Sequence, residues 1–282
     1  MPVKQIYIIG KNGYIGSAFA EWLKKEPEKY TVYTIAAREF RPETFDFSRA
    51  DAVIFAAGIA HLSSKEGKEA PYMPVNCDLA VASAQKAKKD GVGQFLYLSS
   101  MSVYGVEAGE IDRSTPLCPK NEYGRSKKMA EEKLTALHST SFRVCILRPP
   151  MVYGKNCRGN YQTLRRIACS VPVFPVVNNR RSMIHIDNLC AWMQWAIDTR
   201  SAGLLLPQDP FYVSTSEMVR LIATAHGKKK VLIPGFGKLL SALPVSAAKK
   251  AFGSLYYAPS AEDHSVVRTL EEAIAKSEGG VK

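Results

Sequence analysis

The middle of the chain holds polar side chains whose types and spacing suit proton transfer. Tyr123 and Lys127 are four residues apart in a segment with a helical pattern, so both side chains lie on one helix face. A free tyrosine has a pKa of ~10, and a nearby ammonium stabilises the phenolate and lowers that value. Ser99 and Ser100 follow an apolar run, and a hydroxyl at the end of a strand can polarise a substrate carbonyl.

A glycine-rich segment near the N-terminus is suited to holding a diphosphate. It follows a short apolar run and opens a helical segment, and it reads Gly10-Lys11-Asn12-Gly13-Tyr14-Ile15-Gly16. Glycines at this spacing let the backbone turn tightly, approach a pyrophosphate and pack the helix against the strand. The helix N-terminus then faces the negative phosphates. The segment predicts a dinucleotide cofactor, and Lys127 is placed to contact its ribose.

The residues after the second predicted strand bear on which nicotinamide cofactor binds. NAD usually needs an acid there to hold the ribose 2′-hydroxyl. The segment reads Thr34-Ile35-Ala36-Ala37-Arg38, with no acid at the expected place. Arg38 and Lys11 together could bind a 2′-phosphate, so NADP(H) is favoured. The neighbouring Glu39 leaves NAD open.

Short β-branched runs and amphipathic stretches alternate through the first half of the chain. This order predicts an α/β fold with a Rossmann-type, doubly wound parallel sheet. The expected strands are 5–9, 31–35, 52–56, 95–98 and 142–147, and the expected helices are 14–25, 75–89, 122–138, 186–199, 216–226 and 270–276. Prolines break the pattern after Pro149. We therefore predict a dinucleotide-binding domain over 1–155 and 180–200, and a smaller C-terminal substrate-binding lobe over 156–179 and 201–282.

Composition sets further limits. Apolar residues make up 46% of the 282 residues, enough for a sizeable core, and no stretch approaches the ~20 apolar residues of a membrane span. The first residues do not read as a signal peptide, so a cytoplasmic location is expected. The net charge of +12 is spread along the chain, which disfavours nucleic-acid binding. The charge is either an ordinary solvated surface or serves to attract polyanionic small molecules, and the motifs favour the second interpretation. The scattered cysteines predict neither disulfides nor a metal site; they are Cys77, Cys118, Cys145, Cys157, Cys169 and Cys190.

The combination resembles the extended short-chain dehydrogenase/reductase family. The matching stretches are Gly10–Gly16, Ala56–Gly58, Asn76, Leu98–Gly105, Tyr123–Lys127, Leu147–Gly154 and Arg181–Leu189. The resemblance implies that Ser100 and Tyr123 are catalytic, with Lys127 as the partner of Tyr123. It also implies cofactor contacts from Asp46 and Phe47 to the adenine and from the strand-end residues Ala56, Ala57 and Gly58.

Relatives of this kind are mostly epimerases, dehydratases and reductases of nucleotide sugars. The 4,6-dehydratases carry Asp-Glu after the catalytic hydroxyl residue, whereas this chain has Met101 and Ser102, which cannot eliminate water but can line the sugar site. Four stretches resemble a subgroup that reduces UDP-linked 4-keto-6-deoxy-N-acetyl sugars. They are Ala60-His61, Asn179–Ser182, Asp187–Leu189 and Phe252–Leu255. The resemblance implies that Arg181 binds the pyrophosphate of the substrate, with Arg180 as a second partner.

The favoured interpretation is thus an NADP(H)-dependent reductase of a UDP-linked 4-keto sugar, making surface polysaccharide precursors. By analogy at the level of the fold, a homodimer through the helices 75–89 and 122–138 is expected. An NAD-dependent UDP-sugar 4-epimerase is the main alternative. A cofactor-sensing binding protein with the same fold is the non-enzymatic one, although such proteins usually lose the tyrosine or the lysine.

Overall fold

The computed structural model describes residues 2–60, 72–235 and 252–279. These residues form two compact units. The first contains Met1–Gly105, Leu117–Pro149 and Cys190–Leu206, and the second contains Val106–Pro116, Pro150–Leu189 and Pro207–Lys282. The assignment of a cofactor to one region and a substrate to the other remains a prediction. His61 of the predicted subgroup motif lies outside the described residues.

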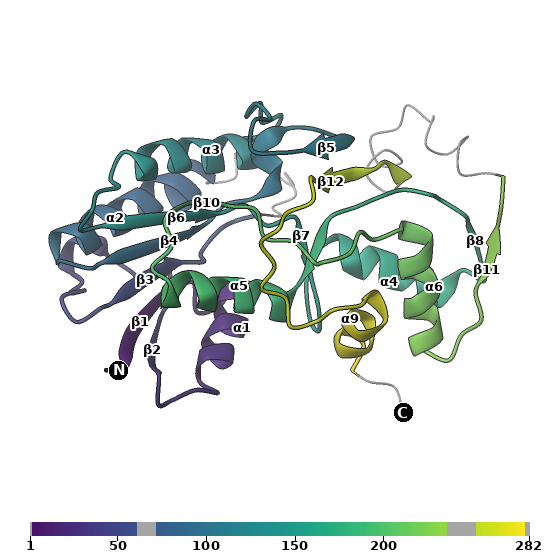
Figure 1. Ribbon diagram of the computed structural model, residues 1–282, viewed down its shortest axis with the longest axis horizontal. Helices are drawn as coiled ribbons and strands as arrows, with labels where there is room; N and C mark the ends of the chain where they lie inside the picture. Colours follow the sequence, from purple (N-terminus) through teal and green to yellow (C-terminus); the bar gives the residue numbers. More distant parts are fainter. Residues whose placement is uncertain (1, 61–71, 236–251, 280–282) are drawn as a thin grey trace. The chain divides into compact units, whose positions relative to one another are not determined.

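A parallel sheet of six strands forms the centre of the first unit (Figure 1). Its order is β10-β6-β4-β3-β1-β2, and the bounds are β1 (Lys4–Ile9), β2 (Tyr30–Ile35), β3 (Ala52–Phe55), β4 (Gln94–Leu98), β6 (Arg143–Leu147) and β10 (Gly203–Leu205). The predicted fold class is confirmed. The edge strand β10 was not predicted, because three residues are too few to show a strand pattern.

Helices cover both faces of this sheet, as its apolar strands require (Figure 1). One face carries α2 (Leu79–Lys89) and α3 (Glu122–Thr135), whose buried residues form one core cluster with alternate residues of β1, β3, β4 and β6. The other face carries α1 (Tyr14–Leu23) and α5 (Ile186–Asp198). All four helices were predicted, with ends that agree or differ by at most three residues, except at the start of α2.

The start of α2 differs from the prediction because a π-helical turn, η2 (Met73–Asp78), precedes it. Pro74 occupies its first turn, and the Leu79 N–H donates to the Pro74 carbonyl, a wider spacing than in an α-helix. A π-turn leaves carbonyl groups outside the usual helical ladder. One of them, on Asn76, accepts a hydrogen bond from the Tyr97 hydroxyl on β4 at 2.8 Å.

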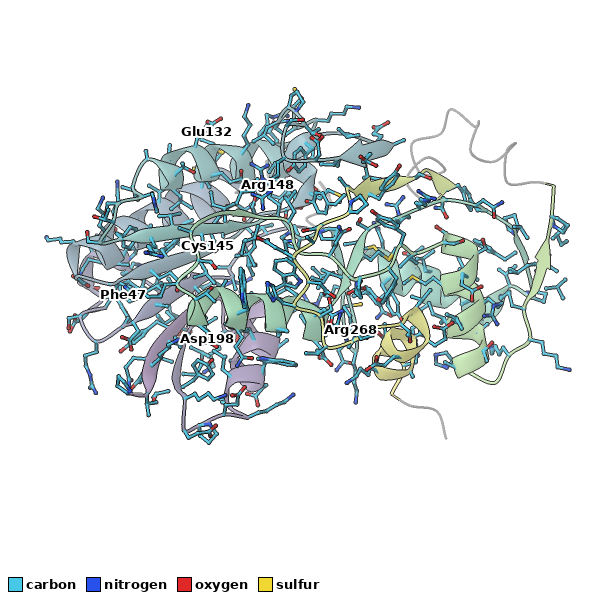
Figure 2. All side chains as sticks on the ribbon, in the orientation of Figure 1. Phe47, Glu132, Cys145, Arg148, Asp198 and Arg268 are labelled. Carbon is cyan, nitrogen blue, oxygen red and sulfur yellow. The ribbon has the colours of Figure 1, made fainter. Side chains whose placement is uncertain are left out.

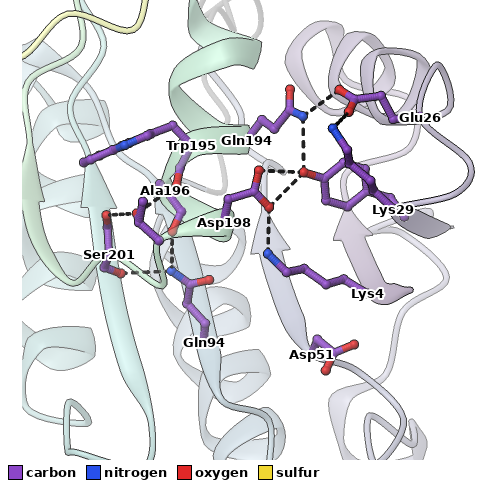
Figure 3. Close-up of polar contacts among 12 residues, drawn as sticks. Lys4, Glu26, Lys29, Asp51, Gln94, Gln194, Trp195, Ala196, Asp198 and Ser201 are labelled. Carbon is purple, nitrogen blue, oxygen red and sulfur yellow. Dashed lines mark hydrogen bonds and ion pairs between the residues drawn. The ribbon is translucent and has the colours of Figure 1, made fainter. Parts of the chain in front are cut away.

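A polar network fastens α5 to β1, β2 and α1 (Figure 3). Asp198 at the end of α5 accepts hydrogen bonds from the Tyr30 hydroxyl at 2.7 and 2.8 Å and from Lys4 at 2.6 Å. Gln194, one turn earlier, donates to Glu26 and accepts from Trp22 on α1. These contacts lie at the amino ends of the strands, away from the carboxyl ends where sheets of this kind place their ligands.

The described residues of the second unit contain short strand pairs and three helices. Its strands pair as β7 (Met151–Tyr153) with β9 (Met183–His185), β8 (Val173–Pro175) with β11 (Val231–Ile233), and β5 (Gly109–Ile111) with β12 (Leu255–Tyr257). The helices are α4 (Asn160–Ser170), α6 (Thr215–Ala225) and α9 (Leu270–Ser277), of which the last two were predicted. Two 3₁₀ turns, η1 (Pro42–Thr44) and η3 (Met101–Tyr104), belong to the first unit. Across the described residues, no helix combines the length and apolarity needed to cross a bilayer.

Candidate active site

The glycine loop joins β1 to α1 and leaves no room for side chains at its key positions. Gly10 has a φ of 125°, and a Cβ there would lie 2.8 Å from the Ala57 nitrogen. A Cβ on Gly16 would lie 2.5 Å from the Gly10 carbonyl oxygen. Gly13 precedes the first helical residue, and the first turn of α1 contains no acid. The predicted loop therefore presents an uncapped helix N-terminus, which fits a diphosphate.

The other predicted cofactor residues around this loop lie at the ends of β1 and β3. Tyr14 and Ile15 are half-buried in the first turn of α1, and Lys11 is exposed. Ala56 donates its N–H to the Ile9 carbonyl at 2.9 Å, which keeps the end of β3 beside the loop. Beyond it, a Cβ on Gly58 would lie 3.3 Å from both the Lys127 Nζ and the Asn76 Oδ1. The structure thus places the predicted cofactor loop and the predicted catalytic lysine at the same edge of the sheet.

Ser100 and Tyr123 are brought together where β4 ends and α3 begins. Ser100 caps η3, and its Oγ accepts from the Ser102 N–H at 3.1 Å. Asn121 caps α3 by accepting from the Gly124 N–H at 2.7 Å. A Cβ on Gly124 would lie 2.7 Å from the Ser102 carbonyl oxygen, so only glycine allows α3 this close to η3. Burial raises the pKa of Tyr123, and its hydrogen bond with Ser100 opposes that increase.

Lys127 lies almost wholly inside the protein, 3% exposed, one turn after Tyr123. Its Nζ donates to the Leu98 carbonyl at the end of β4 at 2.7 Å and lies 4.7 Å from the centre of the Tyr97 ring. Burial lowers the pKa of Lys127 to about 7, while the Glu131 carboxylate one turn further along α3 opposes the shift. Lys127 is therefore only partly charged at neutral pH.

This burial should make Lys127 costly to the folded state. Because its pKa is about 7 when folded and 10.5 when unfolded, the unfolded chain binds more protons between these values, and stability rises with pH across that window. We expect Lys127→Met to increase the free energy of unfolding at pH 7 by about 1–2 kcal/mol after loss of the Leu98 bond. The gain should shrink toward pH 10. Urea unfolding from pH 6 to 10 measures it.

The matched control for this prediction is Lys128→Met, the next residue on the same helix. The Lys128 side chain is 35% exposed and its Nζ is 3.8 Å from Glu132, so its loss should change stability by less than about 0.5 kcal/mol. A Lys127→Met protein that is less stable than the parent at pH 7, or whose difference from the parent does not depend on pH, contradicts the burial argument.

Behind Lys127, a buried ion pair joins α3 to the end of β6. The Arg148 Nε donates to both Glu131 carboxylate oxygens at 3.0 and 3.1 Å, and its Nη1 donates to the Tyr104 hydroxyl at 2.8 Å. The two charged side chains are 10% and 4% exposed. In Figure 2, Arg148 lies between α3 and the sheet, whereas Glu132, the neighbour of Glu131, points outward. The pair holds the turn of α3 that follows the lysine.

The end of β2 holds basic side chains next to a cavity of about 320 Å³. Arg41 lines this cavity, and its Nη1 donates to the Arg38 and Phe40 carbonyls at 3.1 and 3.0 Å. Glu39 lines it too, whereas the exposed Arg38 side chain is not among the lining residues. The structure therefore adds one cation, Arg41, that the sequence prediction did not select.

Asp46 and Phe47, the two residues predicted to contact adenine, differ in exposure: Asp46 is exposed and Phe47 is buried. The Asp46 carboxylate accepts from the Ser48 N–H at 2.8 Å. The Phe47 ring is fully buried among Tyr7, Phe40 and Phe45, and its N–H donates to Asp90 at 2.8 Å. Their predicted contact with adenine stays a prediction, and the geometry gives Phe47 a core function.

Arg181 belongs to the second unit. It exchanges backbone hydrogen bonds with Val213 at 2.9 and 3.0 Å, and its Nη1 donates to the Gly253 carbonyl at 3.0 Å. Burial lowers the pKa of its guanidinium. The neighbouring Arg180 is exposed. The contact of Arg181 with a pyrophosphate remains a prediction.

Comparison with known proteins identifies the family. A model of the NAD dependent epimerase/dehydratase family matches residues 6–205. The UDP-glucose 4-epimerase of Vibrio cholerae is 33% identical over 260 residues, which cover 83% of this chain and 79% of that protein. The chain belongs to the NAD dependent epimerase/dehydratase family. The predicted membership of the extended short-chain dehydrogenase/reductase group, and of an enzyme family, is thereby confirmed.

Other similar proteins are named as epimerases or reductases of different sugar derivatives. An N-acetyl-alpha-D-glucosaminyl-diphospho-ditrans,octacis-undecaprenol 4-epimerase of Escherichia coli O157:H7 is 32% identical over 70% of this chain and 64% of that protein. Among solved structures, a UDP-glucuronic acid 4-epimerase from Bacillus cereus in complex with NAD has a TM-score of 0.75 at 16% identity, covering 98% of both chains. A dTDP-4-dehydrorhamnose reductase from Yersinia enterocolitica has a TM-score of 0.73 at 21% identity, covering 99% and 100%. These structures share the fold.

Several side chains in this family member's site were not given a function from the sequence. Asn76 matched the family pattern only as a single residue, yet its side-chain amide donates to the Ser126 Oγ and the Ile59 carbonyl and accepts from the Ile59 N–H. Tyr97 and Glu131 read as ordinary members of an apolar strand and a polar helix. Arg41 was detectable as a second arginine three residues after Arg38.

Proposed function

We propose that this chain is an oxidoreductase acting at C4 of a UDP-linked sugar, and in the first place an NADP(H)-dependent reductase of a 4-keto sugar for surface polysaccharide precursors. One arrangement supports the proposal above all. Ser100, Tyr123 and Lys127 converge at the carboxyl end of β4, and Met101 and Ser102 stand where a dehydratase needs acids. Such a site can move a proton and polarise a carbonyl but cannot remove water from the sugar.

The proposed functions of the residues follow from their chemistry. The hydroxyls of Ser100 and Tyr123 hold the C4 carbonyl oxygen, and Tyr123 donates the proton as the oxygen gains charge. The Lys127 ammonium stabilises the phenolate that remains. A nicotinamide cofactor, when bound on the glycine loop, supplies hydride at C4. Close placement of the reacting groups then supplies much of the rate.

The preference for NADP(H) is supported by the positive side chains around the first and second strand ends. Arg41 lines the cavity after β2, and Arg38 is exposed three residues before it. The exposed Lys11 donates its backbone N–H to the carbonyl of Ile35 at the end of β2 at 3.1 Å. A 2′-phosphate is well bound by guanidinium groups. Glu39 in the same cavity favours a 2′-hydroxyl instead, so the balance between the two charges decides the cofactor.

The second candidate is an NAD-dependent UDP-sugar 4-epimerase. The names of the Vibrio cholerae and Escherichia coli relatives favour it, because both are 4-epimerases. The same three catalytic side chains serve both reactions. The candidates differ in whether the cofactor is consumed or returns unchanged after each turnover.

Nucleotide binding and turnover together test the proposal. NADPH and UDP should each raise the melting temperature, since ligands that bind only the folded state stabilise it. A UDP-4-keto-6-deoxy-N-acetylhexosamine should then consume NADPH at 340 nm. NAD retained on the purified protein, with conversion of UDP-glucose or UDP-N-acetylglucosamine at C4 and no NADPH consumption, would instead establish the epimerase. Turnover with neither sugar class overturns the proposed activity at C4.

The arginine pair after β2 gives a sharper prediction on the cofactor. We expect Arg38→Ala/Arg41→Ala to weaken NADPH binding by about 10- to 100-fold, because charge-assisted hydrogen bonds to a phosphate contribute roughly 1.5–3 kcal/mol. NAD binding should change by less than threefold. Titration calorimetry measures both, and Arg49→Ala, an exposed arginine of the following loop, is the control. Equal losses for NADPH and NAD would contradict a 2′-phosphate contact.

Two further expectations accompany the proposal. Homodimer formation through α2 and α3 and a cytoplasmic location both remain predictions. Sedimentation of the purified protein measures the first, and a dimer that persists after charged substitutions on the outer faces of α2 and α3 would point to another interface.

A further inference from the structure

Tyr97 is a buried polar side chain for which the proposed reaction has no use. It lies in the middle of the sheet on β4, two residues before the strand-end serines, and is 0% exposed. Apolar β4 residues could fill this place without a hydroxyl that needs a partner. A tyrosine at this position is explained if both its ring and its hydroxyl make specific contacts.

The hydroxyl of Tyr97 contacts the π-turn. It donates to the Asn76 carbonyl at 2.8 Å, and the Asn76 side chain in turn is bonded to Ser126 on α3 at 3.1 Å and to Ile59 after β3 at 2.9 and 3.1 Å. Ser126 is the residue before Lys127. The Tyr97 hydroxyl thus anchors the residue that connects η2, the strand-end loop and the helix of the lysine.

The ring of Tyr97 contacts the lysine itself. The Lys127 Nζ lies 4.7 Å from the ring centre, within the range where an ammonium is attracted by the negative face of an aromatic ring. The Leu98 carbonyl, on the next residue of β4, accepts one of its hydrogens at 2.7 Å. Because Lys127 is only 3% exposed, the ring face and this carbonyl replace part of the water that the ammonium has lost.

We propose that Tyr97 is a positioning residue for Lys127: its ring face favours the charged form of the buried amine and holds it at the carboxyl end of β4, and its hydroxyl fixes the Asn76 carbonyl of the π-turn. The importance of Lys127 for turnover rests on the proposed function. The electrostatic effect of the Tyr97 ring on Lys127 does not rest on that function, and it can be measured without any substrate.

The experiment is a titration of the Lys127 side chain by carbon NMR on protein labelled at the lysine ε-carbons, with Lys127→Met identifying the signal. Three proteins are compared with the parent: Tyr97→Phe, Tyr97→pentafluorophenylalanine and Phe95→pentafluorophenylalanine. Fluorination reverses the charge of the ring face while nearly keeping its shape. Phe95 is the matched control, because it is fully buried on the same strand and the same face of the sheet but packs against Phe142.

We expect Tyr97→Phe to leave the Lys127 pKa within about 0.3 units of the parent, and the fluorinated ring at position 97 to lower it by about one further unit. Fluorination at position 95 should not move it. Tyr97→Phe should instead speed amide exchange at the start of α2 by about five- to tenfold, because the Asn76 carbonyl loses its partner. If the protein with pentafluorophenylalanine at position 97 does not fold, trifluorophenylalanine at the same position gives the same test with a smaller pKa shift.

The outcomes separate this inference from the proposed function. A Lys127 pKa that responds no more to fluorination at position 97 than at position 95 overturns the positioning function, whatever the enzyme does with UDP sugars. A shift confined to position 97 supports it even if neither UDP-sugar assay shows turnover, in which case only the proposed function fails. Where turnover is found, the alkaline limb of kcat should move down in pH with the Lys127 pKa.

Discussion

Replacing Tyr123 by Phe is expected to lower kcat by about 10²- to 10⁴-fold, the usual contribution of a positioned acid–base group. The substitution removes the hydroxyl that the site places at Ser100 and one helical turn before Lys127, and it leaves the ring in place. The Tyr123 hydroxyl is uncharged at neutral pH, so its removal should cost only the hydrogen bond with Ser100, about 0.5–1.5 kcal/mol of the free energy of unfolding. Cofactor oxidation in a single turnover measures the chemical step directly.

The control for Tyr123→Phe is Tyr72→Phe. The Tyr72 ring meets the Tyr123 ring edge-on at 6.2 Å between centres, so it shares the environment without occupying the proposed catalytic position. Its loss should change kcat by less than about threefold. A Tyr123→Phe enzyme that keeps more than a tenth of the parental rate would remove Tyr123 from the proposed mechanism.

Replacing Arg148 by Met is expected to lower the free energy of unfolding by about 3–5 kcal/mol. The reason is the buried Glu131 carboxylate, whose side chain is 4% exposed and whose two oxygens both accept from Arg148. Without the guanidinium it remains an uncompensated charge inside the protein. Urea unfolding monitored by fluorescence measures the loss.

A double-mutant cycle distinguishes pairing from simple packing. The double variant Glu131→Met/Arg148→Met should recover most of the stability, since replacing a whole buried pair by apolar groups is often neutral or stabilising. The exposed pair of Lys128 and Glu132, at 3.8 Å on the same helix, is the comparison, and breaking it should cost under about 1 kcal/mol. Equal losses from the single and double variants of the buried pair would show that packing, not charge, stabilises this site.

These two predictions concern adjacent layers of one helix. Tyr123 and Lys127 face the end of β4, and Glu131 in the next turn is fixed by Arg148 from β6. Replacing Glu131 should therefore also change the pKa of Lys127, because the Glu131 carboxylate raises the pKa that burial lowers. We therefore expect stability and the proposed catalysis to be coupled through the register of α3 against the sheet.

The sequence by itself determined the parts of this protein whose physics is local. The glycine loop was recognisable because tight turns and helix starts constrain a few consecutive residues, and the structure places Gly10, Gly13 and Gly16 in contact-limited positions. Tyr123 and Lys127 share a face because a helix repeats every 3.6 residues. The five strong strands were readable because strands covered on both faces are continuously apolar.

Only the tertiary structure decided how distant residues meet. Tyr97 reads as one more apolar strand residue, and its ring and hydroxyl acquire partners only because the register of β4 against α3 and η2 sets Lys127 and Asn76 beside it. The pairing of Glu131 with Arg148 and the placement of Arg41 and Glu39 around one cavity likewise depend on separations that no spacing rule encodes. Local periodicity fixes which face a side chain occupies, whereas the charge and hydrogen-bond environment of that face is supplied by other elements.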